Sequence, residues 1–271
     1  MAKQKRHAKH RKTKKMNPRA FRKLVRAVLA LVLLGGLAAL SLTVLFPVRR
    51  CTAEGGTRYS ADRFAEAMGI DAEKMNLFTA DTAALADKVH AALPYARVVK
   101  ISRRLPGTLH LTVEERAPAF AQQQDKLWWL LSEDGRLLGT ENASPKGLMP
   151  ITGAALLDPV AGQQAAWKNA FTAPQDIAAL LACLRESSLW PGVSALRIST
   201  AATPDAVYQD RIRIRFGTAT PSGSVGQEAV LAEKLRMAEE VIAQKDAQNP
   251  LQRGILDLST YGKAYFTADW D

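Results

Sequence analysis

Residues 93–118, LPYARVVKISRRLPGTLHLTVEERAP, decide the fold of the first part of this chain. Side chains alternate between the two faces of a β-strand. Val99 and Ile101 are therefore predicted to share one face of a strand that ends at the turn Leu105-Pro106-Gly107. The second strand of this hairpin is predicted to point Leu109, Leu111 and Val113 inward and His110, Thr112 and Glu114 outward.

The residues before this hairpin predict one strand and two helices. Residues 48–54 are a candidate strand that leads into a Gly-Gly turn. Ser60 is a good N-cap for a first helix ending at Gly69, and Asp81 or Thr79 is a candidate cap for a second. The predicted buried side chains are Phe64 and Met68 of the first helix and Leu85, Val89, Ala92 and Leu93 of the second. The predicted order is strand, helix, helix, strand, strand.

The chain has 271 residues and a formal net charge of +11, and all of that excess lies at its start. Residues 1–26 carry twelve Lys or Arg and no Asp or Glu, which leaves 25 basic residues against 26 acidic ones elsewhere. A basic block of this kind can bind nucleic acid or anionic lipid. Because Phe21 is the only aromatic side chain of this block and interleaved aromatics for base stacking are missing, we expect a disordered topology determinant that contacts anionic lipid and no specific nucleic acid.

Residues 27–48 contain no charged side chain and are predicted to form a single transmembrane helix. As a helix they would span about 33 Å, close to the roughly 30 Å hydrocarbon core of a bilayer. The basic region and the apolar stretch are both too long for a cleaved signal peptide. The excess of Lys and Arg before residue 27 predicts a cytoplasmic N-terminus and an extracytoplasmic region from residue 49 onward.

The second part of the outer region is predicted to be richer in strands. Asp134-Gly135 is a strong hairpin turn between two of them. Two amphipathic helices are expected, one opened by Pro174 and one over residues 227–245. Further strands are predicted over residues 120–123, 127–131, 136–139, 193–198, 211–216, 254–258 and 263–267.

The sequence predicts no catalytic, cofactor-binding or metal-binding site. His90 and His110 have no second His or Cys at metal spacing, and adjacent Glu114 and Glu115 should point to opposite faces of a strand and pair with Arg116. Cys51 and Cys183 are expected to be unpaired. The stripe Arg211, Arg213 and Arg215 favours a solvent-facing sheet surface, and docking of an acidic partner stays open as the alternative.

Several motifs in combination resemble the FtsQ/DivIB family of bacterial cell-division proteins and its polypeptide-transport-associated (POTRA) domain. They are Tyr59-Ser60, Gly69-Ile70, Asn76-Leu77-Phe78, Leu93-Pro94-Tyr95, Arg103-Arg104-Leu105-Pro106-Gly107-Thr108 and Val113-Glu114-Glu115-Arg116-Ala117-Pro118. Met149-Pro150-Ile151-Thr152-Gly153 is similar to the family's "LPxIxG" stretch, with Met in place of Leu, and Leu256-Asp257-Leu258 is similar to its C-terminus.

The resemblance implies an α+β protein with a basic tail (1–26), a transmembrane helix (27–48), a POTRA domain (49–116), a mostly antiparallel β domain with two helices (117–268) and a short end (269–271). It implies no enzymatic activity and no cofactor. It also implies a place at the division septum, bitopic partners of the FtsL and FtsB/DivIC types and a role in regulating septal peptidoglycan synthesis.

In the family, the last strand of the β domain presents an edge to the FtsB/DivIC-type partner. Carried to this chain, the predicted partner-binding residues are Lys263, Ala264, Tyr265, Phe266 and Thr267. A protein-transport or secretion component is the alternative, since POTRA domains also precede outer-membrane barrels. A membrane-anchored wall enzyme is a third class, which zymography would reveal.

Overall fold

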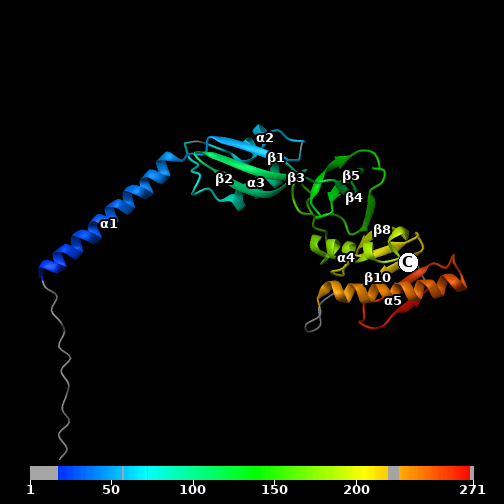
Figure 1. Cartoon of the computed structure of the whole chain (residues 1–271). Coiled ribbons are helices and arrows are strands. Elements are labelled where there is room, and N and C mark those ends of the chain that lie inside the picture. Colours follow the sequence, from blue (N-terminus) through cyan, green and yellow to red (C-terminus); the bar gives the residue numbers. More distant parts are fainter. Residues whose placement is uncertain (1–17, 57, 72, 219–225, 269–271) are drawn as a thin grey trace, which may run out of the picture.

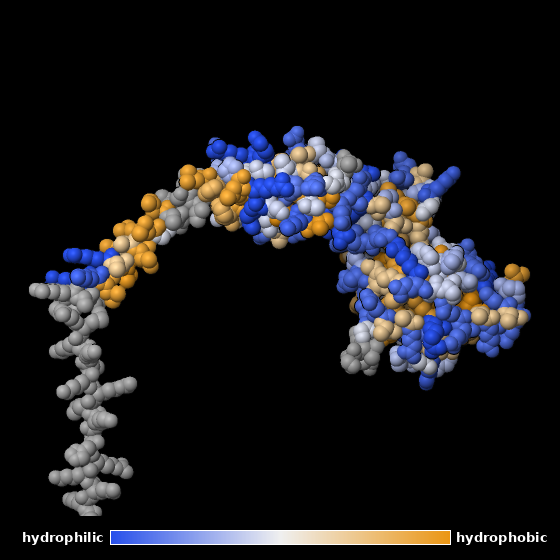
Figure 2. Space-filling view, in the orientation of Figure 1, coloured by the Kyte–Doolittle hydropathy of each residue, from blue (hydrophilic) through white to orange (hydrophobic). Residues whose placement is uncertain are grey.

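The computed structural model describes residues 18–56, 58–71, 73–218 and 226–268, without the side chains of residues 18–21 and 38–44. It begins with one long helix, α1 (Pro18–Leu45), which leads into the first lobe (Figure 1). Most of its described side chains are strongly hydrophobic (Figure 2). Within the described residues, no helix meets the length and hydropathy required to span a membrane. Residues 1–17 of the predicted basic tail lie outside this description.

The first lobe has the predicted order of elements around a three-stranded sheet. The sheet order is β1-β3-β2, with β1 parallel and β2 antiparallel to β3. The elements are β1 (Arg50–Gly55), α2 (Ala61–Met68), α3 (Thr82–Ala92), β2 (Ala96–Arg104) and β3 (Thr108–Glu115). The predicted helical end of the anchor at Val48 is wrong, because α1 ends at Leu45 and Val48 is fully buried in this lobe.

Local chemistry accounts for most of the helix ends in the first lobe. Gly69 ends α2 in the left-handed conformation at φ 64°, which glycine adopts without strain from a side chain. The Asp81 carboxylate caps α3 by accepting hydrogen bonds from two backbone N–H groups. Ser60 lies at the start of α2, but its side chain makes no capping bond, and Ala92 is exposed rather than buried.

A β-bulge changes which side chains of β2 face the core, so the prediction for Val99 is wrong. Leu109, Leu111 and Val113 of β3 are buried as predicted. The register of β2 shifts between Val98 and Lys100, so the extra residue, Val99, is 54% exposed. The inserted residue interrupts the alternation of side chains along the strand. Val98 therefore contacts the core instead of Val99, and Ile101 contacts it as well.

The second lobe is built on a nine-stranded sheet of order β12-β11-β10-β9-β8-β7-β4-β5-β6. Five of its eight pairings are antiparallel, which confirms the predicted tendency, and three are parallel. The strands are β4 (Pro118–Gln124), β5 (Leu127–Ser132), β6 (Leu137–Glu141), β7 (Met149–Gly153), β8 (Val193–Ile198), β9 (Asp205–Tyr208), β10 (Ile212–Arg215), β11 (Gly254–Asp257) and β12 (Tyr265–Thr267).

Two helices complete this lobe, α4 (Pro174–Glu186) and α5 (Gln227–Gln248). Both were predicted, whereas the short helix η1 (Trp190–Gly192) and the strands β7 and β9 were not. The apolar side of each helix joins one core with the sheet, through residues such as Leu180, Leu184, Leu231 and Leu235. Leu256 of β11 and the partly buried Phe266 of β12 belong to this core, which therefore holds the last two strands of the chain in place.

Candidate functional site

The predicted binding residues lie at one edge of the nine-stranded sheet. Tyr265, Phe266 and Thr267 form β12, while Lys263 and Ala264 precede the strand rather than belong to it. β12 pairs antiparallel with β11, and the described residues include no strand on its other side. Lys263, Ala264, Tyr265 and Thr267 are exposed, so the structure presents four of the five predicted side chains to solvent.

Phe266 secures β12 to the lobe. Its ring is partly buried against the main core, and the Lys245 ammonium of α5 lies 5.0 Å from its centroid. Since neighbouring side chains on a strand alternate, Tyr265 points away from the core and is 55% exposed. Tyr265 is therefore available as an aromatic anchor for a partner.

The turn before β12 is tied to α5. The Tyr261 hydroxyl donates to a Glu233 carboxylate oxygen at 2.5 Å, and this hydrogen bond raises the pKa of Tyr261. The turn also contains Gly262 at φ 67° and a backbone hydrogen bond from Lys263 to Thr260. β12 is thus held in place before any partner arrives.

The two edges of the sheet differ in how their backbone is covered. At the β6 edge, Leu137 donates its N–H to the carbonyl of Gln163 and its carbonyl accepts the N–H of Gly162, so a loop covers the start of this strand. The structure describes no backbone hydrogen bond from β12 other than those to β11. Unpaired N–H and C=O groups along a strand can accept an added strand, so the β12 edge is chemically suited to partner binding.

The arginine stripe is already engaged within the chain. Arg213 forms an ion pair with Asp205 at 2.6 Å, and burial raises the pKa of that carboxyl although the arginine opposes it. Arg211 pairs with Asp246 and Arg215 with Asp257. The solvent-facing prediction is wrong for Arg211, of which only 8% is exposed, and each of the three arginines has a carboxylate partner.

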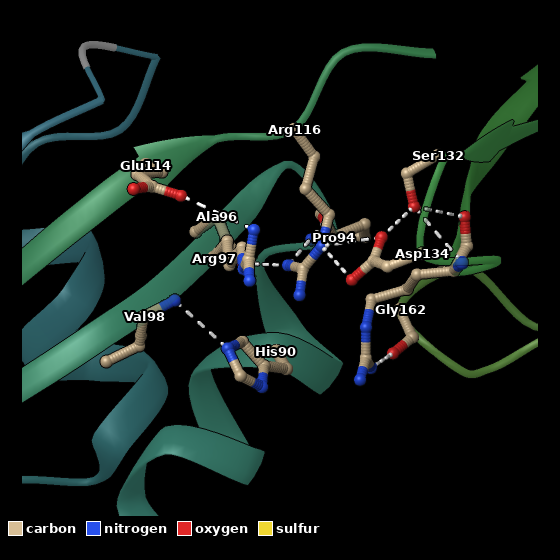
Figure 3. A network of polar contacts seen from close by, with 11 residues as sticks. His90, Pro94, Ala96, Arg97, Val98, Glu114, Arg116, Ser132, Asp134 and Gly162 are labelled. Carbon is tan, nitrogen blue, oxygen red and sulfur yellow. Dashed lines mark hydrogen bonds and ion pairs between the residues drawn. The ribbon is translucent and has the colours of Figure 1, made fainter. Parts of the chain in front are cut away.

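A second polar network joins the two lobes (Figure 3). Arg116, which directly follows β3, is 7% exposed, and its Nε donates to both carboxylate oxygens of Asp134, at 3.0 and 3.3 Å. Its Nη1 donates to the carbonyl of Ala96, and the Ser132 hydroxyl donates to Asp134 at 2.5 Å. Burial raises the pKa of Asp134, but the Ser132 hydroxyl and Arg116 lower it by more, so the carboxyl stays ionised.

The predicted pairing of the Glu114-Glu115 end with Arg116 is therefore wrong. Glu114 pairs with Arg97 at 3.5 Å and Glu115 with Arg58 at 2.9 Å, both at exposed positions. Arg116 instead reaches across to the hairpin turn of the second lobe, because its side chain points into the junction (Figure 3). Asp134 was recognised in the sequence only as a turn residue, and no local signal identified its distant partner.

His90 lies at the same junction and acts as an acceptor. Its Nε2 accepts the backbone N–H of Val98 at 3.0 Å, which requires the neutral ring. Burial lowers the pKa of His90, and the nearby charges of Arg116 and Arg136 lower it further. A Cβ added to Gly162 in the second lobe would overlap the Ala91 carbonyl, so the lobes touch closely here.

Apolar contacts support the same junction. Tyr95 of the first lobe packs against a small cluster of the second that includes Leu130 and Leu138. The Arg58 guanidinium lies 3.8 Å from the centroid of the Tyr95 ring. An open groove of about 750 Å³ runs beside the Arg116–Asp134 pair, and its lining carries both acidic and basic side chains. Across the described part of the chain, no group of His, Cys, Asp or Glu is placed to hold a metal ion.

Comparisons with known proteins identify the first lobe. Residues 46–116 match the model of a POTRA domain of the FtsQ type. The cell division protein FtsQ of Corynebacterium glutamicum is 29% identical over 141 residues, which cover 51% of this chain and 61% of that protein. Residues 46–116 are thus a POTRA domain of the FtsQ type, and the chain is similar to proteins of the FtsQ/DivIB family. The FtsQ-type match starts at residue 46, in agreement with the burial of Val48 in the first lobe.

Among the solved structures that match this chain is the major extracytoplasmic domain of the trans isomer of the cell division protein DivIB from Geobacillus stearothermophilus. The identity is 17% and the TM-score 0.25, with coverage of 49% of this chain and 96% of that one. The POTRA domain and the α+β class predicted from the FtsQ/DivIB resemblance are confirmed. Partner binding by residues 263–267 stays a prediction.

Proposed function

We propose that this cell-division protein is a non-enzymatic scaffold of the division septum. In this proposal it binds small bitopic proteins of the FtsB/DivIC and FtsL types and helps to regulate septal peptidoglycan synthesis. The observation that carries the proposal is the β12 edge, which is held by α5 and has no described backbone partner beyond β11.

Strand addition is the expected mode of binding. A partner strand beside β12 would satisfy backbone groups that otherwise bond only to water, and this gives affinity without a deep pocket. Specificity would come from side chains that alternate along the edge, with exposed Tyr265 as the anchor. Lys263, at the entrance to the strand, would favour an acidic group on the partner.

The scaffold is proposed to be anchored by residues 27–48, with its N-terminus in the cytoplasm and both lobes outside. The support is the sequence: an uncharged stretch of sufficient length follows twelve basic residues. Resistance of the full chain to carbonate extraction, with protease access to the lobes only from outside, is the expected result.

The experiment that tests the edge uses the full chain in nanodiscs and the outer segment of the FtsB/DivIC-like protein from the same genome. Tyr265→Ala should weaken binding about tenfold or more, as expected for an aromatic hot spot. Phe171→Ala is the matched control, because Phe171 is an exposed aromatic (80%) in the loop before α4, outside β12.

Tyr265→Pro tests the backbone component by removing one ladder donor. Its thermal unfolding must match that of wild type for the comparison to hold. Unchanged partner binding by a folded Tyr265→Pro protein would refute strand addition at β12. Diffuse membrane fluorescence of a tagged chain in dividing cells, without a mid-cell band, would count against the septal role, and lysis in zymography against a non-enzymatic one.

A further inference from the structure

The end of the first lobe at which α1 enters is assembled from three segments. The chain leaving α1 forms backbone hydrogen bonds to the turn before α3, from Val48 to Met75 and from Leu77 to Phe46, both at 2.9 Å. It also bonds to the tip of the β2–β3 hairpin, where the Gly107 carbonyl accepts the N–H of Arg49 at 2.9 Å. The hairpin tip is thus fixed beside the end of α1.

Large apolar side chains at this end remain uncovered. We call Leu45, Phe46, Phe78, Leu105 and Pro106 the exit patch. Leu105 is 66%, Leu45 62% and Phe78 48% exposed. The rings of Phe46 and Phe78 meet edge to face at a centroid distance of 5.2 Å. In Figure 2, strongly hydrophobic colour is seen at this end of the first lobe, beside strongly hydrophilic residues.

Hydrogen bonds within the first lobe hold Phe78 in its exposed position. Arg103 of β2 donates from Nε to the carbonyl of Leu77 at 2.7 Å and from Nη2 to the carbonyl of Ala80 at 2.8 Å. The Asn76 side chain accepts the N–H of Phe78 at 2.8 Å. These bonds hold the turn that carries Phe78 outward, so the exposure of this ring is a fixed feature of the fold.

Basic side chains surround the exit patch. Arg49, Arg50 and Arg104 are exposed, and none of them forms an ion pair with another described residue. Arginine beside aromatic and aliphatic side chains is the combination found where proteins meet the headgroup region of a bilayer. The location of the exit patch also agrees with contact to the headgroup region, because the patch lies directly after α1.

We propose that the exit patch and these three arginines dock the POTRA domain onto an anionic membrane surface at the point where α1 leaves it. This inference rests on the proposed anchor. Since α1 tethers the lobe, docking is intramolecular and needs little intrinsic affinity. Docking fixes the direction in which the two lobes project from the membrane, and hence the height of the β12 edge.

The test uses the full chain reconstituted in vesicles, with Cys51 and Cys183 replaced by alanine. A single cysteine introduced by Leu105→Cys carries an environment-sensitive fluorophore, and nitroxide-labelled lipid serves as the quencher. Val99→Cys is the matched control, because Val99 is exposed to a similar degree and lies on β2, the strand that leads to Leu105, but at the bulge rather than at the hairpin tip. Strong quenching at 105 and little at 99 is expected in phosphatidylglycerol vesicles.

Charge dependence is tested with Arg104→Gln and with vesicles of phosphatidylcholine alone. Because each basic residue near an anionic surface contributes roughly 1 kcal/mol, Arg104→Gln should lower the docked-to-undocked ratio about fivefold. Equal quenching in the two lipids would overturn the role of the arginines.

Flotation of the vesicles separates this inference from the anchor. A chain that fails to float with vesicles overturns the anchor and the docking together. A chain that floats but leaves position 105 unquenched overturns docking alone, as does shielding of that position only when a partner protein is added.

Discussion

Replacing Asp134 by asparagine should loosen the junction between the lobes. The Arg116 side chain is 5% exposed, whereas that of Asp134 is 40% exposed. Removing one partner of a fully buried ion pair costs about 3–5 kcal/mol, and an exposed pair contributes about 0.2–1 kcal/mol. The Asp134–Arg116 pair lies between these limits, because only Arg116 is buried and the Ala96 carbonyl would still accept from it. We therefore expect Asp134→Asn to destabilise the junction by about 2 kcal/mol.

Hydrogen exchange gives a local measure of this loss. The Arg116 amide donates to the carbonyl of Tyr95 at 2.7 Å, directly at the junction. A loss of about 2 kcal/mol should speed its exchange about 30-fold if opening of the junction exposes it. The full chain in nanodiscs is the appropriate sample, and amides of the β8–β9 ladder provide the internal reference.

Glu133→Gln is the matched control for Asp134→Asn. Glu133 precedes Asp134 and forms an ion pair with Arg185, but the two side chains are 58% and 48% exposed. Its loss should change stability by less than about 0.5 kcal/mol. Similar exchange rates at Arg116 in the two variants would refute the reasoning from burial.

The same pair predicts a pH dependence. Because the folded-state pKa of Asp134 lies below its ordinary value of 3.8, its contribution is present above that pH and is lost as pH falls toward the folded-state pKa. The difference between wild type and Asp134→Asn should therefore shrink in acid. A difference that stays constant down to the folded-state pKa would show that the ionised carboxylate is not what stabilises the junction.

Three further results are expected. Gly162→Ala should lower the melting temperature more than Gly147→Ala, because both residues have positive φ but only Gly162 lies against backbone of the other lobe; equal losses would contradict a close contact. Burial lowers the pKa of His90 below 6.5, so wild type should lose urea stability relative to His90→Gln as pH falls through that value, and a constant gap would argue against a buried neutral ring. Burial, aided by Asp62, raises the pKa of Cys51 to about 11, so its alkylation at pH 8 should be about 100-fold slower than that of a free cysteine, and rapid labelling would show the thiol to be accessible.

Much of the first lobe follows from local patterns. The alternation of Leu109, Leu111 and Val113 and the N-cap Asp81 are properties of short segments, and the structure confirms them. Val99 shows where such reasoning fails, since a bulge in β2 exposes it. The bulge depends on pairing with β3, which the period of one strand does not reveal.

For the candidate site as well, the sequence predicts some features and the folded structure shows others. The resemblance of the sequence to the FtsQ/DivIB family predicts the last strand and residues 263–267 as the partner-binding edge. Only the folded structure shows that β12 is an edge, that a loop covers the start of β6 at the other edge, and that Lys263 and Ala264 precede the strand. Whether a strand lies at the edge of a sheet depends on which other strands pair with it, so the sequence of that strand alone does not reveal it.

By itself, the sequence determined the basic start of the chain, the apolar stretch that follows, the POTRA order of elements and the resemblance to the FtsQ/DivIB family. These features depend on composition and on periods of two and 3.6 residues, which each segment carries alone. Tertiary structure decided that Arg116 pairs with Asp134 and that Arg211, Arg213 and Arg215 each pair with a carboxylate. It also decided that the rings of Phe46 and Phe78 meet and that the β2–β3 hairpin tip lies beside the end of α1. Each of these joins residues far apart in the chain, and only the folded backbone brings their side chains within reach.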